Sequence, residues 1–215
     1  MEEKLFETNY DVTKKSKVLK FYEANKILIY SVIFLFVFCI ALVTYYSESN
    51  KKERTEISNN YISAKIYIQN NKKNEATKIL KSIVLSNNET YSTLSLFLIL
   101  NENLIENKRE LINLFDHVLE NNKYEKEVEN LIIFKKAVLQ SDFVDETELL
   151  QSIKPLINTN TLWKPHALLL LGDYFVFKKE YLKAKEFYLQ ILSIKDLNRE
   201  LYENAELQLS LISND

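Results

Sequence analysis

The sequence contains a run of twenty uncharged, mostly apolar residues from Ile27 to Tyr46, which reads ILIYSVIFLFVFCIALVTYY. At about 1.5 Å of rise per residue, a helix of this length spans roughly 30 Å, the thickness of the hydrocarbon core of a bilayer. Tyr30, Tyr45 and Tyr46 lie near its ends, where aromatic rings settle at the level of the lipid headgroups. The run therefore predicts a single transmembrane helix over residues 27–46.

Two kinds of processed segment fit this run less well than a retained anchor. A cleavable signal peptide has an apolar core of about 7 to 15 residues and ends in small residues, whereas this run is longer and continues as VTYYSESN. Cys39 lies in the middle of the run behind the bulky Phe38, which is unlike a lipoprotein cysteine. We expect Cys39 to be a small lipid-facing residue.

Positive charges are distributed unevenly around the predicted span. Within about fifteen residues of the span, five lysines precede it, namely Lys14, Lys15, Lys17, Lys20 and Lys26, and three basic residues follow it, namely Lys51, Lys52 and Arg54. The positive-inside rule then keeps residues 1–26 in the cytoplasm and places residues 47–215 on the other side. In a bacterial cell, this is the inner membrane with the C-terminal domain in the periplasm.

The part of the chain after the span is long enough for one domain and has no flexible linker. Of the 28 basic and 30 acidic residues, six and five precede Ser47, so the domain carries 22 and 25, without a long run of either sign. A nucleic-acid surface needs clustered cations, so this class of partner is disfavoured. The only cysteine of the chain lies in the span, which excludes a disulfide within the domain.

The chain contains one glycine, Gly172, and two prolines, Pro155 and Pro165. A β-sandwich or a Rossmann-like fold needs more tight turns than this composition allows, and glycine-rich phosphate-binding loops are excluded. Helical periodicity instead recurs in segments of about 12 to 18 residues. Short polar stretches separate these segments near residues 69–74, 86–89, 105–108, 120–125, 141–146, 158–161 and 178–180. The sequence predicts an all-α domain of helical hairpins.

Two of the hairpins share the spacing of small and aromatic residues that is typical of tetratricopeptide repeats. In the later hairpin these positions are Gly172, Phe175, Ala184, Tyr188 and Ile191. The residues 108 positions earlier are Ala64, Tyr67, Ala76, Leu80 and Ile83. Gly172 and Ala184 are expected to let two helices cross closely, while Phe175 and Tyr188 fill the space beside the crossing.

Three repeat periods of 34 residues make 102, so two diverged hairpins fit between these two. We therefore expect a tetratricopeptide-repeat-like α-solenoid of about four helix pairs. The middle pairs lack the small alanine and are expected to use Leu111 and Leu150, or their neighbours, at the crossing. A last helix is expected to cap the stack with an apolar stripe of Tyr202, Ala205, Leu209 and Ile212.

The residue types that carry catalysis or bind metals are sparse. His117 and His166 belong to no zinc-binding pattern, and no serine or cysteine nucleophile motif is present. The acidic group Asp142, Asp145, Glu146 and Glu148 lacks the glycine and spacing of a calcium loop and is explained by a helix N-terminus. The sequence therefore predicts no enzyme and no cofactor.

The concave surface of a helical stack is the remaining candidate for function. Nine residues are expected to face it: Tyr61, Lys65, Ile68 and Gln69 from the first pair, and His166, Leu169, Asp173, Val176 and Phe177 from the last. Packing between repeats is an equally good interpretation of Leu169 and Val176. The surface lacks the Lys and Asn set that binds carboxylate-terminated chaperone tails, which disfavours that class of partner.

The order of parts, the stretch TLWKPHALLLLGDYFVFKKEYLKAKEFYLQIL and the ending LNRELYENAELQLSLI resemble a bacterial inner-membrane family. That family includes the ancillary subunit of the Sec translocon, and its tetratricopeptide region is related to that of a periplasmic cell-division coordinator. In the ending, Ala205 and Leu209 match the motif LRxRAxxxLxxL, but Glu203 and Asn204 stand where an arginine is usual. The resemblance extends over about residues 15 to 213 and rests on helix-packing motifs.

The resemblance implies a membrane-anchored adaptor for protein partners: translocon subunits, periplasmic folding factors or exported chains. The alternative that it leaves open is a scaffold for cell-envelope or cell-division assembly. The oligomeric state follows from neither the residues nor the resemblance.

Overall fold

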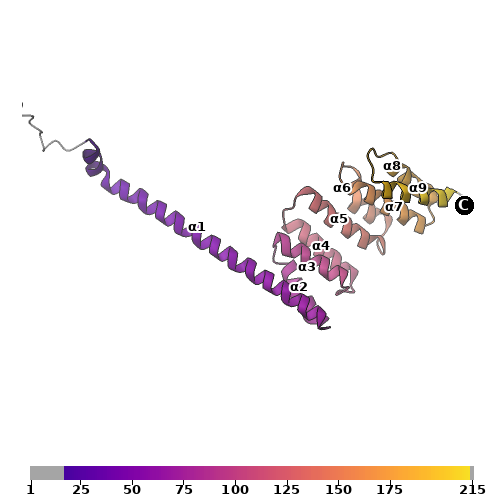
Figure 1. The fold of residues 1–215 in the computed structure, drawn as a ribbon, viewed down its shortest axis with the longest axis horizontal. Coiled ribbons are helices and arrows are strands. Elements are labelled where there is room, and N and C mark those ends of the chain that lie inside the picture. Colours follow the sequence, from indigo (N-terminus) through magenta and orange to yellow (C-terminus); the bar gives the residue numbers. More distant parts are fainter. Residues whose placement is uncertain (1–16, 214–215) are drawn as a thin grey trace, which may run out of the picture. The chain divides into compact units, whose positions relative to one another are not determined.

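The computed structural model describes residues 17–213 of the chain. Over these residues it contains helices and no strand, and short loops join the helices (Figure 1). The helices are α1 (Lys17–Gln69), α2 (Lys73–Val84), α3 (Glu89–Asn101), α4 (Lys108–Asn121), α5 (Lys126–Ser141), α6 (Glu146–Ile157), α7 (Lys164–Phe177), α8 (Tyr181–Leu192) and α9 (Arg199–Ser213). The prediction of an all-α chain is confirmed for the part described, and each predicted polar stretch overlaps a loop between two helices.

Helix α1 contributes to two compact units, one that ends at Thr55 and one that begins at Glu56. This helix, near the N-terminus, is long and apolar enough to span a membrane, and it contains the predicted span, residues 27–46. Every side chain from Tyr30 to Ser49 is exposed, as a lipid-facing surface requires. Lys14 and Lys15, which enter the orientation argument, lie outside the described residues, as does the rest of the first sixteen.

In the second unit, consecutive helices pack against one another from α2 to α9, and α7 also contacts α5 and α9. Its buried apolar residues form two clusters. The N-terminal core joins the end of α1 to helices α2 to α5 and includes Ala64, Leu80, Leu96, Phe115 and Ile132. The C-terminal core joins α5 to α9 and includes Ala137, Leu149, Leu168, Tyr188 and Ala205. Helix α5 contributes to both cores.

The crossing of α7 and α8 depends on the single glycine. A Cβ atom on Gly172 would lie 2.3 Å from Cε1 of Tyr188, well inside van der Waals contact. Tyr188 and Ala184 are fully buried, and Phe175 is buried beside them. The prediction that Gly172 permits a close crossing, with Phe175 and Tyr188 filling the adjacent space, is confirmed.

The two middle hairpins bury different residue types at their crossings. Leu111 is buried on α4. On α6, Leu149 is fully buried, whereas its neighbour Leu150, which was expected at the crossing, is half-buried. Small residues are buried on the first helix of each of these hairpins, Ser95 on α3 and Ala137 on α5.

Helix α9 covers the end of the C-terminal core with most of its predicted stripe. Ala205 is fully buried, and Leu209 and Ile212 pack against the core. Tyr202 was expected on the same stripe, but it is exposed. Leu197, from the loop that leads into α9, packs against the core and covers it ahead of Ala205.

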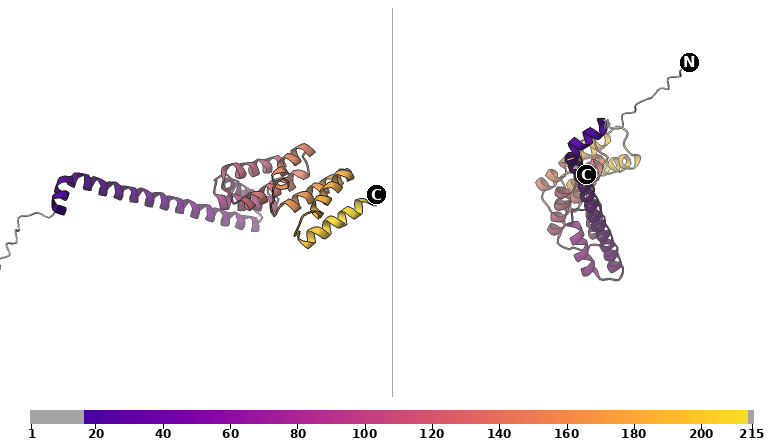
Figure 2. Two further views of the ribbon diagram at one scale, coloured as in Figure 1. Left: turned by 90° about the horizontal axis from the view of Figure 1, so that it is seen from above. Right: turned by 90° about the vertical axis from the view of Figure 1, so that its left-hand side faces the viewer.

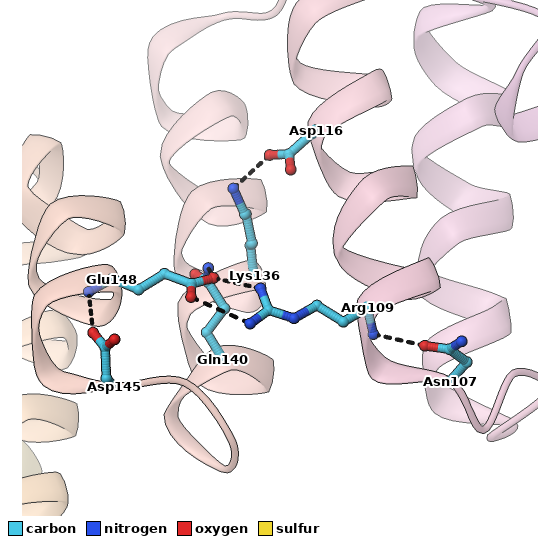
Figure 3. Close-up of polar contacts among 7 residues, drawn as sticks. All are labelled: Asn107, Arg109, Asp116, Lys136, Gln140, Asp145 and Glu148. Atoms are coloured by element: carbon cyan, nitrogen blue, oxygen red, sulfur yellow. Dashed lines mark hydrogen bonds and ion pairs between the residues drawn. The ribbon is translucent and has the colours of Figure 1, made fainter.

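Polar contacts connect α4, α5 and α6 at the boundary between the two cores (Figure 3). Arg109 Nη1 on α4 lies 3.0 Å from Glu148 Oε1 on α6, and Gln140 Nε2 on α5 donates to the same oxygen at 3.4 Å. Lys136 on α5 pairs with Asp116 on α4. Exposed ion pairs each contribute about 0–1 kcal/mol, so their main effect here is to fix how neighbouring helices are aligned.

Arg109 and Glu148 lie in the first turns of α4 and α6. The side chains of the residues that precede these helices cap their backbones (Figure 3). Asn107 Oδ1 accepts a hydrogen bond from the backbone N–H of Arg109 at 3.0 Å, and Asp145 Oδ1 accepts one from Glu148 N–H at 2.9 Å. Glu146 lies in the first turn of α6 as well. The acidic group expected at a helix N-terminus is therefore confirmed there for Asp145, Glu146 and Glu148.

Candidate partner-binding groove

A hollow of about 470 Å³ lies where the start of α4, the end of α5 and one side of α7 meet. We call it the α7 groove, and its lining residues are Lys108, Ser141, Asp142, Leu170, Asp173, Tyr174 and Phe177. The four α7 residues are spaced three and four positions apart, which puts them on one side of the helix. The groove is therefore formed by one face of α7, the start of α4 and the end of α5.

The cationic group of the groove is already paired. Lys108 Nζ lies 2.9 Å from Asp142 Oδ2, and the same ammonium group lies 5.5 Å from the ring centroid of Phe143. Because Asp142 neutralises Lys108, the remaining carboxylate in the lining is that of Asp173. The lining residues consequently carry one net negative charge.

Tyr188 holds the carboxylate of Asp173 in place from the core side. Its hydroxyl donates a hydrogen bond to Asp173 Oδ1 at 2.7 Å. Desolvation raises the pKa of the Asp173 carboxyl above its ordinary value, although the hydrogen bond from Tyr188 acts in the opposite direction. Burial, followed by the interaction with Asp173, raises the pKa of the Tyr188 phenol, so the hydroxyl remains a donor.

The apolar part of the groove is formed by two aromatic residues of α7 that differ in exposure. Tyr174 is buried, and Lys178 Nζ lies 5.4 Å from its ring centroid. Phe177, at the last residue of the helix, is 81% exposed. A large exposed aromatic side chain next to a carboxylate suits a polypeptide segment that offers an apolar residue and a basic one.

The structure places two of the nine predicted surface residues in this groove, Asp173 and Phe177. Leu169 and Val176 pack against the C-terminal core, as the packing interpretation requires. His166 lines a separate hollow of about 580 Å³ between the start of α7 and the loop before α9.

The four predicted residues from the first pair lie on the last turns of α1. In the order in which the helices follow one another, α2 to α6 come between these turns and α7. The ring of Tyr61 lies 5.7 Å from that of Tyr91, and Ile68 packs against the N-terminal core. Lys65 and Gln69 are exposed. The first and last pairs thus contribute to different cores, so their predicted surface residues are not gathered in one hollow.

Both histidines make local contacts. His166 packs among aromatic rings, with centroid distances of 5.5 Å to Trp163 and 6.0 Å to Phe134, and its Nδ1 is buried without a hydrogen-bond partner. His117 Nε2 lies 2.8 Å from Asn87 Oδ1. Within residues 17–213, no group of three or more His, Cys, Asp and Glu side chains is placed to hold a metal ion.

Five lining residues of the groove were not predicted: Lys108, Ser141, Asp142, Leu170 and Tyr174. Lys108 and Asp142 lie in two of the predicted polar stretches and are 34 residues apart, one tetratricopeptide period. Applying that period to the loops, and not only to the helices, identifies this ion pair from the sequence. Leu170 and Tyr174 are found by extending the Asp173 and Phe177 face by one helical turn.

Asp173→Asn is expected to remove a pH-dependent loss of stability. The pKa of this carboxyl is raised above 3.8 in the folded chain, so folding favours its protonated form. The contribution of Asp173 to stability is complete at pH values below the pKa that the carboxyl has in the unfolded chain. It is lost as the pH rises through the higher pKa that the carboxyl has in the folded chain. Thermal unfolding followed by circular dichroism measures this difference. As the pH rises from about 3 to about 7, the unfolding midpoint of the asparagine variant should rise relative to that of the natural chain. A pH-independent difference between the two chains would contradict this assignment.

Comparison with known proteins gives no relative of this chain. No family model matches the sequence, and neither a curated protein nor a solved structure matches it significantly.

Proposed function

We propose that the chain is a non-enzymatic adaptor that is anchored in a membrane by residues 27–46 and binds a protein partner in the α7 groove. The observation that carries the proposal is the exposed Phe177 beside Asp173 in a hollow of a domain that follows an apolar helix of membrane-spanning length. Exposed aromatic side chains in a concave site are typical anchors for a partner side chain.

The domain is interpreted as a tetratricopeptide-repeat-like solenoid. The end of α1 with α2, α3 with α4, α5 with α6 and α7 with α8 make four pairs, and α9 caps the last. Contacts between alternate helices, from α5 to α7 and from α7 to α9, support this interpretation because first helices of neighbouring repeats touch in a stack. The α7 groove then belongs to the surface lined by first helices.

The span gives this surface its location. Close to the membrane, basic residues are more numerous before the span than after it, so residues 1–26 are cytoplasmic and the domain is periplasmic in a bacterial inner membrane. A tether of this kind raises the effective concentration of the groove next to membrane complexes, so a weak site there binds without high intrinsic affinity. Function depends on the anchor as much as on the groove.

The partners proposed are translocon subunits, periplasmic folding factors and chains that are being exported. Emerging polypeptides expose apolar residues before they fold, and Phe177 offers them an apolar contact. The carboxylate of Asp173 selects among such segments for those with a neighbouring basic residue. The resemblance to the inner-membrane translocon family supports the same class of partner.

The test is site-specific photocrosslinking in intact cells. A photoreactive phenylalanine analogue at position 177 should capture protein partners, while the same analogue at position 182 should capture several-fold less. Leu182 is the matched control because it is 82% exposed, as Phe177 is 81% exposed, but it lies outside the α7 groove. Equal capture at both positions would overturn the groove as the binding site. Capture of cytoplasmic proteins alone would overturn the periplasmic location.

A further inference from the structure

The described chain begins with a short helical segment that turns before the span. Helix α1 leaves helical geometry at Asn25, where φ is −119° and ψ is 15°. The side-chain amide of Asn25 donates a hydrogen bond to the carbonyl oxygen of Phe21 at 3.0 Å, which caps the segment ahead of the turn. Figure 2 shows these first turns bent away from the axis of the rest of α1. The segment is therefore distinct from the span that follows.

The residues of this segment divide into an apolar and a polar side. Leu19, Phe21 and Tyr22 are exposed and lie on one side of the helix. Lys20 and Glu23 lie on the other. An exposed amphipathic helix joined directly to a membrane span fits the boundary between lipid headgroups and acyl chains.

A contact across the turn sets which side faces the bilayer. The hydroxyl oxygens of Tyr22 and Tyr30 lie 2.5 Å apart, and their rings meet edge to face with centroids 6.3 Å apart. Tyr30 belongs to the first turn of the span, so the apolar side that carries Tyr22 is turned toward the span. In a membrane, that side is the one turned toward hydrocarbon.

Charge around the segment identifies the kind of lipid. Five lysines and one acidic residue, Glu23, occur between positions 14 and 26. Clusters of this size next to a membrane helix are attracted to anionic headgroups. We propose that the segment from Lys17 to Asn25 lies in the interface beside the span and binds anionic phospholipids through its lysines. The inference rests on the membrane anchor of the proposed function and is independent of the α7 groove.

The depth of the segment is measured on the full chain with spin labels in lipid bilayers. In a Cys39→Ser background, Phe21→Cys and Glu23→Cys carry the label on the apolar and polar sides. In bilayers of phosphatidylcholine and phosphatidylglycerol, the ratio of accessibility to oxygen over a water-soluble nickel complex should be several-fold higher at position 21 than at position 23. Equal ratios at both positions would overturn the interfacial placement.

The lipid preference is measured with charge-matched variants. Adding phosphatidylglycerol to phosphatidylcholine should raise the ratio of oxygen accessibility to nickel accessibility at position 21. The double change Lys17→Gln with Lys20→Gln should abolish that rise. The control is Lys51→Gln with Lys52→Gln, which removes equal charge on the other side of the span and should leave the rise intact. A rise unaffected by the first pair, or abolished equally by both pairs, would overturn specific binding by the segment.

A label on the natural Cys39 separates this inference from its premise. Cys39 lies in the middle of the span, so its label should be accessible to oxygen and shielded from nickel in every bilayer. If it is exposed to nickel, the membrane anchor itself fails. If it is shielded while positions 21 and 23 are alike, only the interfacial segment fails.

Discussion

Replacing Gly172 with alanine is expected to destabilise the helical domain by about 1–3 kcal/mol, the usual cost of overpacking a core. In an unconstrained helix the same change stabilises by about 1 kcal/mol, because alanine is the better helix former. Here the new Cβ would lie 2.3, 2.7 and 2.8 Å from Cε1, Cζ and Cδ1 of Tyr188. That ring is fully buried and hydrogen-bonded through its hydroxyl to Asp173, so moving it away would disturb the core packing and that hydrogen bond. Urea unfolding of the full chain in detergent, followed by circular dichroism, measures the difference.

The chain contains its own control for this prediction. At the equivalent crossing 108 residues earlier, Ala64 and Leu80 are both fully buried in the N-terminal core. A Cβ is therefore accommodated where the facing residue is leucine. Gly172→Ala should cost less in a Tyr188→Leu background, with a coupling energy of about 0.5–3 kcal/mol. Additive effects of the two changes would show that the close contact with the ring is not the cause of the destabilisation.

Local features of the fold were predictable from the sequence because they depend on residues close together in the chain. Gly172 and Tyr188 belong to one hairpin, so their spacing alone indicates the crossing that the structure contains. The loops follow from short polar stretches for the same reason. The exposed Tyr202 shows the limit of such periodicity, since a loop residue rather than the helix stripe covers the core at that point.

Contacts between hairpins were not predictable in the same way. Arg109 and Glu148 are 39 residues apart, and their pairing depends on how α4, α5 and α6 stack. The α7 groove has the same origin, because Lys108 and Asp142 reach it from other hairpins than the one that carries Phe177. Periodicity gives the buried face of each helix but not the alignment between neighbouring pairs, and it is this alignment that decides which exposed residues share a hollow.

Two charges in the middle of the span, Phe36→Lys with Val37→Lys, are expected to release the chain from the membrane. A lysine at the centre of a membrane helix costs about 2.5–3.5 kcal/mol, and each apolar residue that it replaces had favoured insertion by about 0.3–0.6 kcal/mol. The pair therefore costs roughly 6–8 kcal/mol. Thirteen Ile, Leu, Val and Phe residues in the run together favour insertion by about the same amount, so the net drive is lost.

Membrane fractions washed with alkaline carbonate distinguish an inserted helix from a surface attachment. The natural chain should remain in the pellet and the Phe36→Lys, Val37→Lys variant should appear in the supernatant. Ser47→Lys with Ser49→Lys adds the same charge just beyond the span and should leave the chain in the pellet. If the central lysines also leave it in the pellet, residues 27–46 are not what holds the chain in the membrane.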